Sequence, residues 1–166
     1  MKTALLFALL AVPALADSAG GISWTAPKTW KTDAPRPMRE ATYLVAAAKG
    51  DTDSGECGVF YFGQGQGGGV DANIDRWVSQ FEGAKAPVRK KEKLAGFDVT
   101  TVEVDGTYGS SMGGPMGPKT PKPGFKLLGA IVEGPKGNVF FKFTGPAKTI
   151  EAARADFLKM LKSVTK

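Results

Sequence analysis

The sequence predicts an α+β domain in which a mostly antiparallel sheet of about six strands packs against two amphipathic helices. Apolar residues recur at helical spacing in two segments, 71–82 and 149–164, while the remaining apolar segments have the length of strands. The connections between those strands are mostly short enough for hairpins, which join antiparallel neighbours. The expected order is two or three strands, a helix, four strands and a final helix.

Two strands are expected before the first helix, after an extended opening over residues 22–30. Residues 41–48 contain the apolar run Tyr43-Leu44-Val45, and Lys49-Gly50-Asp51 ends it. In 57–62, apolar side chains occupy both phases, with Cys57 and Val59 on one face and Phe60 and Phe62 on the other. This pattern predicts a central strand that is covered on both sides.

The first helix is expected over residues 71–82. Its apolar residues fall at i, i+3, i+4 and i+7: Ile74, Trp77, Val78 and Phe81. Asp71 is of a type that caps helix N-termini, and Gly83 is of a type that follows helix ends. We therefore expect Trp77 on the buried side of an amphipathic helix capped by Asp71.

Four strands are expected next, at 88–94, 97–104, 126–133 and 138–144. The apolar phase of 97–104 changes at Thr100-Thr101, which predicts a bulge or two covered faces. Residues 109–124 hold Gly, Pro, Ser and Met without periodicity, so we expect a 16-residue loop there. Thr149 is the expected cap of the last helix, whose buried stripe would be Ile150, Ala153, Phe157, Leu161 and Val164.

The first sixteen residues have the pattern of an export signal. Lys2 supplies a positive end, 4–12 is an apolar stretch too short to span a bilayer, and Ala14-Leu15-Ala16 is a small-x-small cleavage site. We expect cleavage after Ala16, which leaves a single domain over 17–166 in the periplasm or outside the cell. The mature chain would begin at Asp17, so the residue directly after the cleavage site is not the cysteine that lipid attachment requires.

Composition restricts the chemistry. The formal charge is +6, and the one basic cluster, Arg89 to Lys93, is interpreted as a solvated strand edge whose lysines oppose sheet aggregation rather than as a site for an acidic partner. The chain has no histidine, which excludes Ser-His-Asp and Cys-His hydrolysis and imidazole zinc sites. Cys57 is the only cysteine, so it is expected to be a buried core thiol, with an intermolecular disulfide as the alternative.

Two segments are candidate binding sites. The run 63–69 matches G-x-G-x-x-G at Gly63, Gly65 and Gly68, which admits a phosphate at the following helix end or, alternatively, only a tight turn. Met112 and Met116 in the 109–124 loop supply two thioethers, the ligand type that Cu(I) prefers. Long loops on rigid sheets also often contact partners.

The segments Trp24-x-x-Pro27-x-x-Trp30 and Asn73 to Trp77, with the early hairpin and the closing helix, resemble the Mog1/PsbP-like α/β/α sandwich. The resemblance covers nearly all of 22–164 and extends to small exported bacterial proteins of unknown function built on that scaffold. Members of that superfold act as accessory or adaptor proteins, some in photosystem oxygen evolution and some with a small GTPase. They share no catalytic motif, so the resemblance implies a fold and a binding role, with no site residues.

We therefore expect a non-enzymatic binding or adaptor protein of the bacterial envelope that needs no cofactor. Its expected partner is another envelope protein, bound through loops 63–69 and 109–124, with no nucleic acid and no stable membrane insertion. The alternative is a periplasmic small-ligand carrier, for a phosphate-bearing ligand at the glycine loop or Cu(I) at the methionine loop. A pocket with convergent polar groups would favour the carrier, and a flat apolar patch above about 600 Å² the adaptor.

Overall fold

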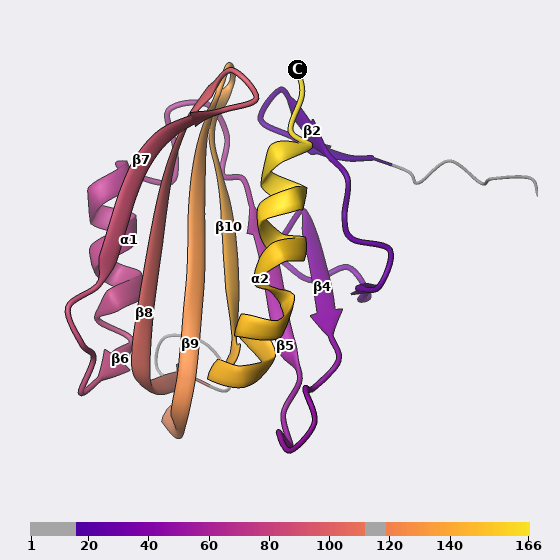
Figure 1. The fold of residues 1–166 in the computed structure, drawn as a ribbon. Coiled ribbons are helices and arrows are strands. Elements are labelled where there is room, and N and C mark those ends of the chain that lie inside the picture. The colour runs from indigo at the N-terminus through magenta and orange to yellow at the C-terminus, as the bar shows by residue number, and fades with distance from the viewer. Residues whose placement is uncertain (1–15, 112–118) are drawn as a thin grey trace, which may run out of the picture.

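The structure, a computed structural model, describes residues 16–111 and 119–166 (Figure 1). The described ranges form two helices, α1 (Val70–Val78) and α2 (Ala147–Lys162), and ten strands. The strands are β1 (Asp17–Ala19), β2 (Ile22–Trp24), β3 (Lys31–Thr32), β4 (Ala41–Val45), β5 (Gly55–Phe60), β6 (Phe81–Glu82), β7 (Val88–Leu94), β8 (Phe97–Ser111), β9 (Lys119–Gly134) and β10 (Gly137–Pro146).

The strands form two sheets, and every described pairing is antiparallel. β1 and β2 make a two-stranded hairpin, and the eight-stranded sheet has the order β3-β4-β5-β10-β9-β8-β6, with β7 also paired to β8. The α+β class and the mostly antiparallel sheet are confirmed, but the prediction of about six strands is wrong. The additional strands β1, β2, β3 and β6 have only two or three residues, too few for a hydrophobic alternation to identify them.

The two helices lie on opposite faces of the large sheet (Figure 1). α2 packs on β9 and β10, while α1 packs on the other face next to β8. The two faces have separate apolar cores, because Phe141 and Phe143 of β10 belong to the α2 side and Phe140 to the α1 side. Each helix covers only part of its face, and this leaves the hollows described below.

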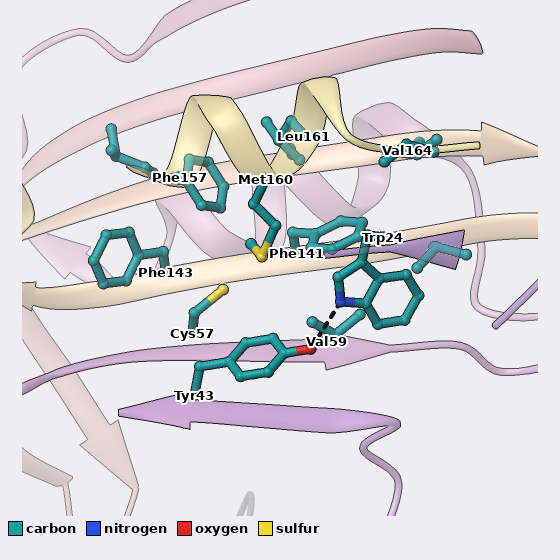
Figure 2. Packing of buried hydrophobic residues seen from close by; sticks show 14 of the residues in the cluster. Trp24, Tyr43, Cys57, Val59, Phe141, Phe143, Phe157, Met160, Leu161 and Val164 are labelled. Atoms are coloured by element: carbon teal, nitrogen blue, oxygen red, sulfur yellow. Dashed lines mark hydrogen bonds between the residues drawn. The ribbon is translucent and has the colours of Figure 1, made fainter. Parts of the chain in front are cut away.

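The core on the α2 side also contains the hairpin β1–β2 and the single cysteine. Figure 2 shows Cys57 among Tyr43, Phe143 and Met160, and its side chain is fully buried. Trp24 donates its indole N–H to the Tyr43 hydroxyl at 2.8 Å, and the Tyr43 hydroxyl donates in turn to the Asp17 carboxylate. The prediction of a core thiol is confirmed, as is the prediction of a central strand at β5 between β4 and β10.

Both predicted helix caps are wrong, and the buried stripes are right only in part: Ile74 and Trp77 are buried on α1 as expected, but Val78 is only partly buried, and Val164 is buried beyond the end of α2. α1 begins after Gly69, whose backbone occupies the cap position without a side-chain bond, and it ends at Val78, so Phe81 lies in β6. α2 begins after Pro146, because the rigid φ of proline suits a helix start. Thr149 instead lies inside the first turn, where its N–H and hydroxyl donate to the Asp51 carboxylate of a neighbouring loop at 3.0 and 2.6 Å.

The predicted 109–124 loop is largely strand. β8 continues to Ser111 and β9 begins at Lys119, with Gly109 opposite Pro121 and Ser110 opposite Thr120. The backbone groups of these residues pair across the two strands, although their side chains have no apolar period. The sequence pattern therefore could not reveal these strand segments. The phase change at Thr100-Thr101 reflects two covered faces, and the register irregularity in β8 lies instead between Gly106 and Tyr108.

Candidate functional site

The glycine-rich segment is a tight turn held by α1. Gly63, Gly65, Gly67 and Gly68 have positive φ angles from 70° to 99°, a region that side chains other than glycine rarely adopt. Asn73 of α1 is buried and donates from its amide to the carbonyl oxygens of Gly67 and Gly69, both at 2.8 Å. The backbone conformation thus accounts for Gly63, Gly65 and Gly68 without a ligand.

The other sequence candidates lie apart from this turn. Met112 and Met116 fall outside the described residues. Burial raises the pKa of the Cys57 thiol far above its ordinary value, which keeps the thiol protonated and unreactive. Within the described ranges, no group of three or more Asp, Glu, Cys or His side chains is placed to hold a metal ion.

One hollow is a groove between α2 and the β7–β8 side of the sheet, which we call the α2 groove. Its volume is about 330 Å³, and most of its exposed lining is apolar. The lining residues are Val88, Lys90, Glu92, Leu94, Thr101, Val102, Glu103, Leu128, Gly129, Arg154, Phe157, Leu158 and Lys162. The groove exists because α2 crosses β9 and β10 and leaves the inward phase of β7 without a helix above it.

An ion-pair network connects α2 to the sheet beside this groove. Arg154 donates to both carboxylate oxygens of Glu103, at 2.9 and 2.7 Å, and also pairs with Glu151 at 2.7 Å. Lys126, with a side chain only 9% exposed, pairs with Glu103 at 2.7 Å and with Glu151. Hydrogen bonds from Arg154 and Lys126 lower the pKa of Glu151 to about 2 and also depress that of Glu103. The network is charge-paired throughout, so it fixes the helix rather than offering a free acid or base.

The basic cluster is the edge strand β7, as predicted. β8 is the only strand paired with β7 in the described ranges, so the outer backbone edge of β7 is open. Every basic side chain of the cluster has an acidic partner: Arg89 with Asp75, Lys90 with Glu92, Lys91 with Glu133 and Lys93 with Asp98. These pairs are exposed, so each is worth little energetically, and the strand remains a basic edge.

A second hollow lies on the opposite face, between α1 and the β5–β10 part of the sheet, and we call it the α1 cavity. It has a volume of about 180 Å³ and is lined by Phe60, Phe62, Arg76, Trp77, Gln80, Phe140 and Lys142. Lys142 donates from Nζ to Gln80 Oε1 at 2.5 Å and to the Tyr108 hydroxyl at 3.3 Å. Desolvation, reinforced by the charges of Arg39 and Arg76, lowers the pKa of Lys142 to about 8.

Sequence reasoning missed both hollows. Lys142 had a signal, because it occupies the same phase as Phe140 in the run Val139 to Phe143, where an inward lysine is unusual. The α2 groove had none, since its residues come from β7, β8, β9 and α2 and meet only through the position of the helix.

Comparison with solved structures assigns the fold to the PsbP/Mog1-like sandwich. The chain is similar to cyanobacterial PsbP (CyanoP) from Synechocystis sp. PCC 6803, with a TM-score of 0.57 and 10% identity over 95% of this chain and 95% of that one. It is also similar to LpqN, which is involved in cell envelope biogenesis of Mycobacterium tuberculosis, with a TM-score of 0.59 and 10% identity over 94% and 86% of the two chains. The expected resemblance is confirmed at the level of fold.

Sequence comparison adds no family: no protein-family model matches the chain, and no curated protein matches it. At 10% identity the structural likeness defines the scaffold alone, and the residues of the two hollows must be interpreted from their own chemistry. In the described part of the chain, neither helix is long and apolar enough to cross a membrane.

Proposed function

We propose that this protein is an exported, non-enzymatic adaptor of the bacterial envelope that binds an extended, acidic segment of another envelope protein along β7 and in the α2 groove. The observation that carries the proposal is the exposure of apolar side chains at this one place. Three large apolar side chains are exposed in the described residues, and two of them, Val88 (65%) and Leu158 (39%), line the α2 groove.

The shape and charge of this surface favour a peptide chain as the occupant. β7 presents seven residues whose outer backbone groups have no strand partner in the described ranges, so a partner strand can add to them. Four of the seven residues of the strand are basic and only Glu92 is acidic, while the other acidic partners of these side chains lie on α1, β8 and β9. Lys162 adds another positive charge to the groove. An acidic segment with apolar side chains would therefore complement both the edge and the groove.

The non-enzymatic part of the proposal is supported by the state of the charged groups. Arg154 is bonded to Glu103, and Lys90 to Glu92, so both carboxylates that line the groove are held in ion pairs. General acid–base catalysis requires a group that is free to exchange a proton with a substrate. A surface of paired charges around apolar side chains is instead typical of a binding interface.

Export is supported by the N-terminal pattern and by the place of Asp17. Asp17 is the first residue of β1, and its carboxylate accepts the hydrogen bond from Tyr43. Cleavage after Ala16 would leave this strand and this bond complete. The fold shared with LpqN, itself involved in envelope biogenesis, is consistent with a role in the same compartment.

Site-specific photocrosslinking in the living host tests the proposal. A photoreactive residue at Leu158 should give one discrete adduct with an envelope protein, and peptide mapping should place the crosslink in an acidic, apolar segment. The matched control is Met38, an apolar side chain that is 75% exposed near β4, at the far end of the sheet from β7. It should give no such adduct.

The double charge reversal Lys90→Glu with Lys162→Glu should reduce the Leu158 adduct about tenfold, because the surface would then repel an acidic segment. Circular dichroism and thermal unfolding of the variant establish that it remains folded. Equal adducts at Leu158 and Met38, a lipid-sized adduct, or no dependence on the charge reversal would contradict the proposal.

A further inference from the structure

The α1 cavity contains an ammonium group with only neutral partners. Lys142 Nζ is bonded to the Gln80 amide oxygen and the Tyr108 hydroxyl, and it lies 5.3 Å from the centre of the Tyr108 ring. Among the described residues, Lys142 has no carboxylate within 4.0 Å, unlike the similarly inward Lys126 on the other face. A desolvated cation without a counter-charge is costly, so this position has an unmet preference for an anion.

A second cation faces the same cavity. Arg76 of α1 lines its mouth and donates only to Asn73 Oδ1, a neutral acceptor, with no ion pair among the described residues. Lys142 lies opposite Gly58 in the sheet register. Because Gly58 has no side chain, Arg39 Nη1 can lie only 3.3 Å from the point that a Cβ of residue 58 would occupy. Arg39 pairs with Glu56 at 2.7 Å, and Arg36 shares that carboxylate. The surroundings of the cavity are therefore net positive.

The walls of the cavity are aromatic. Phe62 and Phe140 have ring centroids 5.7 Å apart, and Phe60 stacks on Phe62 at 6.3 Å. The edge of Trp77 meets Phe140 at 6.4 Å. Such walls do not favour a bare hydrated ion, because they would strip its water without replacing the hydrogen bonds. They favour a ligand with an apolar body beside its charge.

The volume limits the size of that body. The cavity holds about 180 Å³, and an apolar cavity of about 150 Å³ is large enough for benzene. A single ring with one carboxylate attached is thus the appropriate size. A planar carboxylate also matches the guanidinium of Arg76, which presents parallel N–H groups.

We propose that the α1 cavity is a binding site for a small organic carboxylate, with its ring against Phe60, Phe62 and Phe140 and its carboxylate between Arg76 and Lys142. This site is on the opposite face from the α2 groove and does not depend on the adaptor function. The ligand would give Lys142 the counter-charge that the folded chain does not supply.

Isothermal titration calorimetry with benzoate as the probe tests the assignment. Benzoate should bind with a dissociation constant in the range of about 10 µM to 1 mM. The neutral isostere benzamide should bind at least about tenfold more weakly, because it lacks the charge that pairs with Lys142. Inorganic phosphate, which lacks the ring, should also bind at least about tenfold more weakly.

Variants locate the binding. Lys142→Met should weaken benzoate binding by about tenfold or more, and Arg76→Gln, an exposed position that leaves the core intact, provides an independent test by the same criterion. Lys90→Met, in the α2 groove, is the matched control and should leave the affinity within about twofold. The proposal is overturned if benzoate does not bind, if benzamide or phosphate binds as tightly, or if neither Arg76→Gln nor Lys142→Met weakens binding more than the control.

Discussion

Gly129→Ala should destabilise the protein by overpacking the contact between β9 and α1. Gly129 has no positive φ, so alanine adds no backbone strain, and only space decides the outcome. A Cβ at this position would lie 2.6 Å from Trp77 Cζ3, 2.7 Å from Cε3 and 2.9 Å from Val102 Cγ1. Carbon atoms prefer about 3.5 to 4.0 Å, so the indole would have to move by about 1 Å.

The indole has little room to make that shift. Trp77 is 4% exposed and meets the edge of Phe140, so displacement disturbs the α1-side core. Overpacking of this kind costs about 1–3 kcal/mol, and we expect the free energy of unfolding to fall by about 2 kcal/mol. For a domain of this size the midpoint temperature should fall by roughly 4–8 °C.

Urea denaturation followed by circular dichroism measures this change, and a second substitution identifies its cause. Trp77→Leu removes the clashing ring, so Gly129→Ala should cost at least about 1 kcal/mol less in that background than in the wild type. A loss below about 0.5 kcal/mol in the wild type, or strictly additive costs, would refute the packing argument.

Three further outcomes are expected. Tyr43→Phe should lower the free energy of unfolding by about 1–3 kcal/mol, because it leaves the buried Trp24 indole N–H without its acceptor. The control Tyr61→Phe removes an exposed hydrogen bond and should lower it by less than about 0.5 kcal/mol, and urea titration compares the two variants. Cys57 should react with a thiol reagent only at the rate of unfolding, so fast labelling of the native protein would be inconsistent with its complete burial. The pKa of Glu151 is about 2 in the folded protein and 4.5 ordinarily, so its contribution to the free energy of unfolding is complete above pH 4.5 and is lost as the pH falls towards 2. The free energy of unfolding of wild type should exceed that of Glu151→Gln by about 0.5–1 kcal/mol at pH 7, and this difference should shrink at pH 3. A difference that stays constant with pH would argue against the ion-pair network.

Local patterns predicted the elements whose side chains are sorted by burial. The stripe with Ile74 and Trp77 identified α1, and the two apolar phases of 57–62 identified a central strand covered on both faces. Elements formed by backbone pairing alone escaped detection. Residues 109–111 and 119–124 have no apolar period, yet each strand supplies hydrogen-bond partners to the other.

The candidate site was less predictable because both hollows are products of tertiary arrangement. Val88 and Leu158 are separated by 70 positions, and only the path of α2 across the sheet makes them neighbours. The position of Lys142 in an inward phase of its strand was a signal in the sequence. The sequence could not show, however, that its hydrogen-bond partners would be the neutral groups of Gln80 and Tyr108 rather than a carboxylate. The G-x-G-x-x-G pattern admitted a phosphate site at Gly63, Gly65 and Gly68, but the positive φ angles of the turn account for these glycines without a ligand.

The two hollows lie back to back and share part of a wall. Gly129 lines the α2 groove, while on the other side of β9 its missing side chain makes room for Trp77, which lines the α1 cavity. A molecule that displaced Trp77 would therefore press on the strand beneath the groove. If that pressure changed the affinity of the groove for a chain along β7, linkage would require such a chain to change the affinity of the cavity by the same factor. Gly129 would then determine how strongly binding on one face of the sheet changes binding on the other face.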